Sequence, residues 1–270
     1  MADTAELLEH VQDAEALHLP FGLTWEIPQP LAALGFHITK FMLIELIVAL
    51  LMVAIFIPLA RRIASGERPR GLLWNMFEAV LVFIRDEIAR PAIGRHDAER
   101  FLPFLWTTFF FVLMVNLFGM LPWAGSATGS LSVTSALAAI VFGTVLISGM
   151  RKYGVVKFWI GQVPHMDLPL PLAIILKPMI FCIEVASLAI KHAILAVRLF
   201  ANMFAGHLVL AVILGFIVAT AQMMVWYAVA PASLFGATAL SMLELMVAFL
   251  QAYVFTFLSA LFIGMAIHQH

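Results

Sequence analysis

The chain has 270 residues, of which 63% are hydrophobic and only 11% charged, and its mean hydropathy is +1.03. Because a soluble domain carries about 25% charged residues, this composition excludes a soluble protein, and the formal net charge of −1 gives no indication of a nucleic-acid partner. Apolar runs longer than the roughly 10-residue alternating segments of a membrane barrel predict an all-α membrane protein instead.

The distribution of charge predicts the orientation of the chain. The first 39 residues contain six acidic residues and no lysine or arginine, whereas eight of the 15 Lys and Arg residues lie between Arg61 and Arg100. Because cytoplasmic loops carry the excess of basic residues, we expect segment 1–40 to lie outside and segment 63–100 to face the cytoplasm. The N-terminus lacks a basic region, so no secretory signal is expected there.

The first predicted transmembrane helix covers residues 41–62. Its apolar part has the ~20 residues that a crossing needs, and Arg61 and Arg62 close it on the inner side. Residues 71–88 then place apolar side chains at helical spacing on one face. This pattern predicts an amphipathic helix that lies on the membrane surface or packs against a partner.

Segment 101–150 is predicted to hold the second and third transmembrane helices, at 101–121 and 131–150. A short polar turn joins them on the outer side. The following segment, 151–171, is predicted to be a cytoplasmic loop because it is basic. Its basic residues are Arg151, Lys152 and Lys157.

Segment 172–267 consists of two apolar runs that are both too long for one upright crossing. At 1.5 Å per residue the first run, 172–230, would extend roughly 85–90 Å as one helix, against a hydrocarbon core of ~30 Å. Pro231 is the strong helix breaker between the runs. The sequence therefore predicts an all-α polytopic membrane protein with about five membrane-embedded helices, a surface amphipathic helix, and a C-terminal hairpin of two long, tilted helices that turns at Pro231.

Polar residues recur at a spacing of seven in the first long run. Lys177, Glu184, Lys191 and Arg198 share one helix face, which Asn202 continues. An arginine at bilayer depth costs roughly 2.5 to 3.5 kcal/mol, so Arg198 indicates a protein that handles ions or charged groups inside the membrane. For the lysines, an ion ladder that only holds helices together is an equally good interpretation.

Three further polar residues follow on the predicted hairpin. Glu244 and Gln251 stand seven residues apart on one face of the second helix, and His207 lies beyond Arg198 on the first. Pairing about Pro231 places His207 near position 255 and Glu244 near position 218, although helix tilt could still bring both into one cavity. An acid and an imidazole within hydrogen-bond reach would form a proton site.

Three stretches carry a resemblance to a known family. RLFANMFAGH (198–207), LELMVAFLQAYVFTFLSALFI (243–263) and NLFGMLP (116–122) are similar to the a subunit of F-type ATP synthase. The similarity covers essentially the whole C-terminal half, and the combined motif is long and specific.

The resemblance implies a stator proton channel packed against a ring of c subunits that each carry a carboxylate. It also implies b-type peripheral stalk subunits and membrane lipid as partners, and a bacterial inner membrane with the C-terminus in the cytoplasm. It implies neither catalysis by the chain itself nor any metal or cofactor. Arg198 matches the family's indispensable arginine, and His207 with Glu244 fits relatives in which the acid and the imidazole are exchanged. The expected ion path comprises Arg198, Asn202, His207, Glu244, Gln251, Glu184 and Lys191.

Two other classes of function compete with this interpretation. A proton- or cation-coupled secondary transporter would need an internal repeat with matching broken helices, and the two halves show no similarity. A haem protein would need histidines on facing helices, whereas His192 and His207 both lie on one predicted helix.

Overall fold

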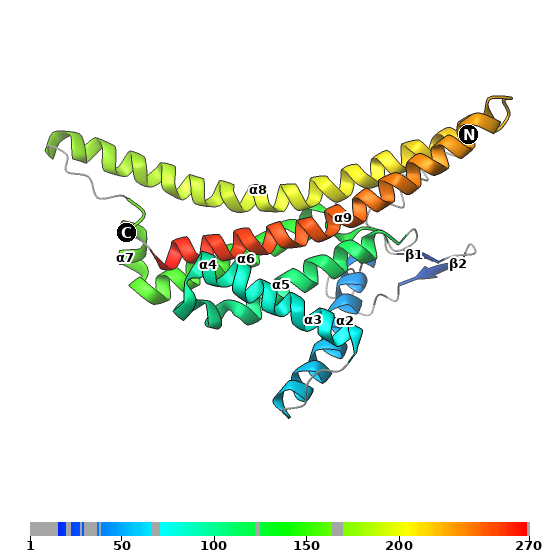
Figure 1. Cartoon of the computed structure of the whole chain (residues 1–270). Helices are drawn as coiled ribbons and strands as arrows, with labels where there is room; N and C mark the ends of the chain where they lie inside the picture. Colours follow the sequence, from blue (N-terminus) through cyan, green and yellow to red (C-terminus); the bar gives the residue numbers. More distant parts are fainter. Residues whose placement is uncertain are drawn as a thin grey trace.

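The computed structural model describes residues 16–19, 23–27, 29, 37, 39–65, 71–121, 125–163 and 170–268. These residues are almost entirely helical, which confirms the all-α class (Figure 1). The elements in chain order are β1 (Ala16–Leu19), β2 (Leu23–Glu26), α2 (Lys40–Ala64), α3 (Leu72–Phe83), the π-helix η3 (Ile84–Ala89), α4 (Arg90–Ile93), α5 (Arg95–Gly119), the 3₁₀-helix η4 (Ala127–Gly129), α6 (Leu131–Tyr153), α7 (Val155–Ile160), α8 (Leu170–Ala219) and α9 (Trp226–Ile267).

Five helices, α2, α5, α6, α8 and α9, are long and apolar enough to cross a membrane, which confirms the predicted polytopic fold. α5 begins at Arg95, six residues before the expected start at 101. Gly94 separates it from α4 with φ +94°, a conformation that glycine adopts without strain. The first turn of α5 is charged, so the apolar pattern alone did not reveal it.

A two-stranded antiparallel sheet precedes α2 and was not expected. Its register pairs Ala16 with Glu26 and Leu19 with Leu23. Strands of four residues are too short to give a clear alternation in the sequence, so this element escaped prediction.

The predicted amphipathic segment, 71–88, forms α3 and most of η3, and α4 continues it; η3 and α4 pack along α5 and α9. Ile84 and Ile88 are fully buried, as the helical spacing predicted, and Ile93 beyond the predicted segment is buried as well. The π-helical conformation of η3 was not predicted. A π-helix has a wider turn than an α-helix, so the spacing of an α-helix, on which the prediction was based, does not reveal it. Gly264 of α9 allows the close approach of α4, since a Cβ there would overlap the carbonyl oxygen of Ala92.

The long hairpin is present, but the predicted turn at Pro231 is wrong. α8 ends at Ala219, the chain reverses between Thr220 and Val225, and Pro231 lies inside α9. Met223 N–H donates to Thr220 O and Trp226 N–H donates to Met223 O, so short turns reverse the chain. Apart from Gln222, the residues of this turn are small or apolar, and none is a glycine or proline that would indicate a turn. A proline near the start of a helix, in contrast, leaves most of the helix's hydrogen bonds intact.

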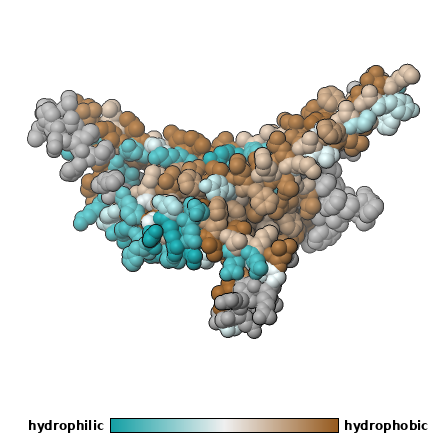
Figure 2. Space-filling model, in the orientation of Figure 1, coloured by the Kyte–Doolittle hydropathy of each residue, from teal (hydrophilic) through white to brown (hydrophobic). Residues whose placement is uncertain are grey.

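α8 is bowed, and its outer edge, away from α5 and α6, is concave (Figure 1). With 50 residues it is about 75 Å long, far more than the ~30 Å core of a bilayer. Figure 2 shows this outer edge as hydrophobic over most of its length. Nine exposed apolar side chains recur at intervals of three, four or seven residues, so they share one face and form one ridge: Ile175, Met179, Ile183, Ile190, Ile194, Val197, Phe204, Leu208 and Val212.

Candidate functional site

Two contacts fix the register between the antiparallel helices α8 and α9. The ring centroids of His192 and Phe262 lie 4.8 Å apart, and a Cβ added at Gly206 would overlap the carboxylate of Glu244. Arg198 precedes Gly206 by eight residues, and the residue eight positions after Glu244 is Ala252. The register therefore places Arg198 beside the turn of α9 that contains Gln251.

Arg198, His207 and Gln251 hold buried nitrogen atoms that have no hydrogen-bond partner in the described part of the chain. These atoms are Nε and Nη2 of Arg198, Nε2 of His207 and Nε2 of Gln251. Gln251 is only 4% exposed. Because buried polar groups in proteins are almost always hydrogen-bonded, these atoms indicate partners from outside the chain, such as water or a group of another subunit.

Glu244 lies against α8 at the residue before His207. The absence of a side chain at Gly206 leaves room for the half-buried Glu244 carboxylate. The chain reverses between Thr220 and Val225, at least six residues before Pro231. This earlier turn changes the pairing of the two helices, so the residue opposite His207 is near Glu244 and not at position 255. The structure thus brings the predicted acid and imidazole into one region, although His207 Nε2 has no hydrogen-bond partner among the described residues.

The other predicted site residues follow α8 in both directions from Arg198. Asn202 and Glu184 are half-buried, and Lys191 is exposed. Among the described residues, neither Glu184 nor Lys191 forms a salt bridge. The ion-ladder interpretation therefore gains no support from ion pairs in the described chain. Figure 2 shows hydrophilic atoms along the middle of the α8–α9 pair, within an otherwise hydrophobic surface.

A buried polar network behind the pair was not predicted. The Asn116 side chain of α5 donates to Ala248 O at 3.5 Å and accepts from the Thr128 hydroxyl at 2.9 Å. Ala248 lies between Glu244 and Gln251 on α9, so the network holds their helix against α5 and η4. Sequence reasoning used Asn116 only as part of a motif, since the spacing of a single buried amide carries no periodic signal.

Asn116→Ala is expected to lower the stability of the chain. The substitution leaves the fully buried Thr128 hydroxyl and Ala248 carbonyl without this partner, at a cost of about 1–3 kcal/mol. The apparent melting temperature of the purified protein, followed by tryptophan fluorescence, measures the effect. Asn75→Ala, which removes an exposed amide on α3, is the control and should leave that temperature unchanged; equal melting temperatures for both variants would contradict the role given to the network.

His192 is a second buried polar residue that the predicted set did not include. It is 4% exposed and lies between the rings of Phe142 and Phe262, at 4.8 Å from each centroid. Its Nδ1 lies 2.8 Å from Leu188 O of the preceding turn. Its aromatic neighbours come from α6 and α9, so His192 packs three helices together.

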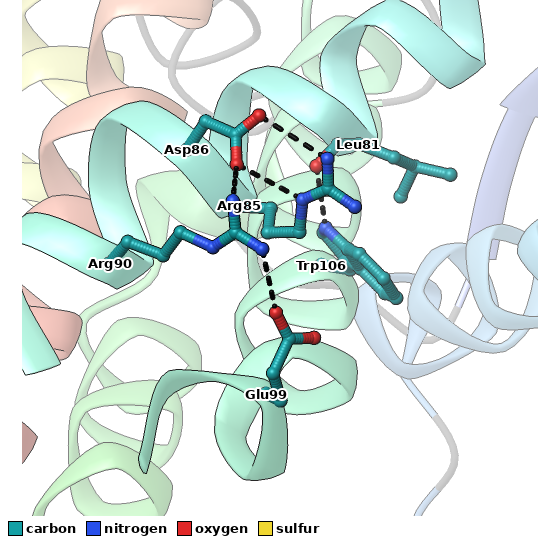
Figure 3. A network of polar contacts seen from close by, with 6 residues as sticks. All are labelled: Leu81, Arg85, Asp86, Arg90, Glu99 and Trp106. Atoms are coloured by element: carbon teal, nitrogen blue, oxygen red, sulfur yellow. Dashed lines mark hydrogen bonds and ion pairs between the residues drawn. The ribbon is translucent and has the colours of Figure 1, made fainter. Parts of the chain in front are cut away.

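A cluster of charged side chains joins η3 and α4 to the start of α5 (Figure 3). Asp86 accepts hydrogen bonds from Arg85 at 3.1 Å and Arg90 at 2.6 Å, and Arg90 also donates to Glu99 at 3.0 Å. The Arg85 guanidinium holds the pKa of the Asp86 carboxyl below its usual value. Because these side chains are partly open to solvent, each pair contributes little stability, and the pairs chiefly orient η3 and α4 against α5.

The described residues contain no group of three or more His, Cys, Asp or Glu side chains that could hold a metal ion. An apolar cavity of about 840 Å³ lies between α2 and α5, and no titratable side chain lines it. The chemistry of the described residues therefore centres on the α8–α9 pair.

The chain matches the family model described as ATP synthase A chain over residues 42–264. It is 41% identical over 240 residues to ATP synthase subunit a of Myxococcus xanthus, a match that covers 88% of this chain and 76% of that protein. It is 36% identical over 266 residues to ATP synthase subunit a of Chloroherpeton thalassium, covering 97% of this chain and 76% of the relative. The matched residues of this chain, 42–264, include Arg198 and every other residue of the expected ion path.

Proposed function

Because the chain belongs to the ATP synthase A chain family, we propose that α8 and α9 carry protons between the two sides of the membrane and a ring of partner subunits that each bear a carboxylate. The chain is a multi-pass membrane subunit of ATP synthase and takes part in proton translocation. The observation that carries the proposal is the guanidinium of Arg198. It lies near the middle of α8, and two of its buried nitrogen atoms have no partner within the described chain.

Arg198 borders the free apolar ridge of α8. Its neighbours one turn away and one residue away, Ile194 and Val197, are 58% and 52% exposed. A subunit that packs on this ridge would bring its own groups within reach of the guanidinium. A carboxylate is the group that compensates a buried, permanently charged arginine best, because the pair forms charge-assisted hydrogen bonds.

The path then consists of two half-channels that end at different levels on either side of Arg198. A proton from outside passes His207 and Glu244, which lie towards the end of α8 at which the hairpin turns, and protonates a ring carboxylate. The neutral carboxyl can rotate through lipid, since a charged one would meet a large desolvation cost. Nearly one turn later it releases its proton to the inner half-channel, near Glu184 and Lys191, and faces Arg198 as a carboxylate.

Arg198 performs two tasks in this scheme. Its fixed positive charge favours the ionised form of the ring carboxyl, which promotes proton release. The same charge repels protons between the half-channels and prevents a direct leak. Asn202 lies about one turn after Arg198 on α8, and Gln251 lies opposite Arg198 on α9. Their side-chain amides can orient water or the arriving carboxylate.

The assembly follows from the same premise. The ring of c subunits packs on the ridge of α8, and b-type stalk subunits hold the chain against rotation. The chain itself contributes no catalytic residue, and ATP is made elsewhere in the complex. The proposal includes a bacterial inner membrane as the location, and the basic loops support an orientation with the N-terminus outside and the C-terminus in the cytoplasm.

Purification tests the assembly directly. The chain, tagged and isolated from native membranes in mild detergent, should retain a ring of small two-helix subunits whose carboxylate reacts with a carbodiimide. A secondary transporter, the competing class, would be isolated without such a ring and would still move its substrate in vesicles. That result would contradict the proposal.

Gly206→Ala is expected to slow proton flux about tenfold, because the added Cβ overlaps the Glu244 carboxylate and displaces it from α8. Passive proton conduction through the membrane sector, reconstituted in vesicles, measures the change. Gly215→Ala is the matched control, since a Cβ at this other glycine of α8 meets no atom within 4 Å. Equal slowing by both substitutions would show that helix flexibility, and not the position of Glu244, limits the flux.

A further inference from the structure

A second, separate pocket lies where α5 begins and where α6 and α9 end. Its volume is about 400 Å³, within the usual range for ligand pockets. Phe101, Ile147 and Ile267 form apolar walls, and Arg100, Arg151 and Lys152 are the basic residues that line it. The pocket shares no residue with the α8–α9 path.

The charge of this pocket is not balanced within the described chain. Asp97, its acidic residue, is paired with Lys152 at 2.9 Å, and His268 Nε2 lies 3.9 Å from the same carboxylate oxygen. Arg100 and Arg151 are exposed and form no ion pair with any described residue. Two guanidinium groups therefore remain available to an anion.

The position of these arginines along the helices matches the level of lipid headgroups. Arg100 directly precedes the apolar part of α5, and Arg151 directly follows that of α6. Further along α6 towards the membrane interior, Ile147 and Ile140 are 52% and 58% exposed. An anion bound between the arginines would therefore lie at the mouth of an apolar surface that faces the hydrocarbon core.

From this arrangement we infer that the pocket binds the phosphate group of an anionic phospholipid of the cytoplasmic leaflet, with an acyl chain along Phe101 and Ile147. The planar fork of arginine matches phosphate oxygens, and basic pockets between helices on the cytoplasmic side suit such headgroups. The apolar walls distinguish the site from one for a soluble anion, which would gain nothing from Phe101 and Ile147. The bound lipid would join α5 and α6 at the same end as the Asp97–Lys152 pair.

Photo-crosslinking of the intact, delipidated complex tests this inference. The probe is phosphatidylglycerol with a diazirine on one acyl chain, and peptide mass spectrometry locates and quantifies the adduct near Ile147. Unlabelled phosphatidylglycerol should compete, whereas phosphatidylcholine with the same chains and inorganic phosphate should not. Each arginine near a membrane surface contributes about fivefold in affinity, so Arg100→Gln with Arg151→Gln should weaken half-maximal labelling about 30-fold. Arg61→Gln, the same exchange at an exposed arginine of α2 outside the pocket, should leave labelling unchanged.

Several results would overturn the inference. Equal competition by phosphatidylcholine would show that the headgroup is not selected, and equal competition by inorganic phosphate would show a soluble-anion site. Unchanged labelling of the double variant, together with loss of another subunit from the complex, would identify the pocket as a protein contact. If the double variant does not assemble, competition on the unsubstituted complex decides between these outcomes.

Discussion

Arg198→Ala abolishes ATP synthesis coupled to the proton gradient, if the guanidinium separates the two half-channels. Without the fixed charge, the ring carboxylate loses the partner that favours its ionised form, and nothing repels protons between the half-channels. A hydrogen bond to a charged group contributes about 3 kcal/mol at most, so loss of this partner alone corresponds to a fall of about 100-fold in coupled rate, and the proton leak removes the remainder. The measurement is ATP synthesis by inverted membrane vesicles, with growth on a respiratory carbon source as the cellular counterpart.

The controls for this substitution separate charge from shape. Arg198→Lys keeps a cation but loses the planar fork and can lose its proton, so it should remain severely impaired. Lys157→Ala removes an exposed positive charge on α7 and should leave synthesis unchanged. Normal respiratory growth of the Arg198→Ala strain would refute the role given to this residue.

Glu244→Gln and His207→Ala are each expected to slow proton flux by about 100-fold or more while the complex still assembles. Both side chains lie in the same region of the α8–α9 pair, and a positioned proton donor or acceptor typically contributes 10²–10⁴-fold to proton transfer. Passive proton uptake by vesicles that contain the membrane sector measures the flux, and the yield of intact complex measures assembly.

Exchange of the two residues provides the sharpest control for this second prediction. A His207→Glu, Glu244→His double variant restores an acid beside an imidazole and should recover much of the flux that either single change removes. Thr238→Ala, which removes a hydroxyl that bonds only to its own helix at Leu234 O, should have no effect. Flux that stays normal in Glu244→Gln and in His207→Ala would remove both residues from the path.

The features of the fold that leave a periodic pattern were predictable from the sequence, because that pattern follows from the lipid and protein surroundings of each helix face. The lipid environment requires long apolar helices, and the seven-residue recurrence that leads to Arg198 survives in the structure because α8 is one continuous helix. The amphipathic face that contains Ile84 and Ile88 was equally clear, since burial of one face leaves a helical period in the sequence.

Features set by single contacts were not predictable. Pro231 predicted a turn that the chain makes earlier, between Thr220 and Val225, and this error misplaced His207 relative to Glu244. The correct register between α8 and α9 depends on the absence of a side chain at Gly206, and no periodic pattern in the sequence reveals this. The hydrogen bond from Asn116 to Ala248 joins residues 132 positions apart, and such a tertiary contact leaves no local pattern.

The buried inner side of α8 determines how the chain responds to force. Leu195, Leu199 and Met203 are buried behind the middle of the helix, on the side opposite the exposed ridge, and α8 also contacts α6, η4 and α9. In the proposed assembly, a rotor that pushes sideways on Arg198 would therefore meet a helix that is supported from behind. The work done by each proton would then be delivered as torque instead of being lost in bending, and the stiffness of this support would set the back-pressure at which the motor slips.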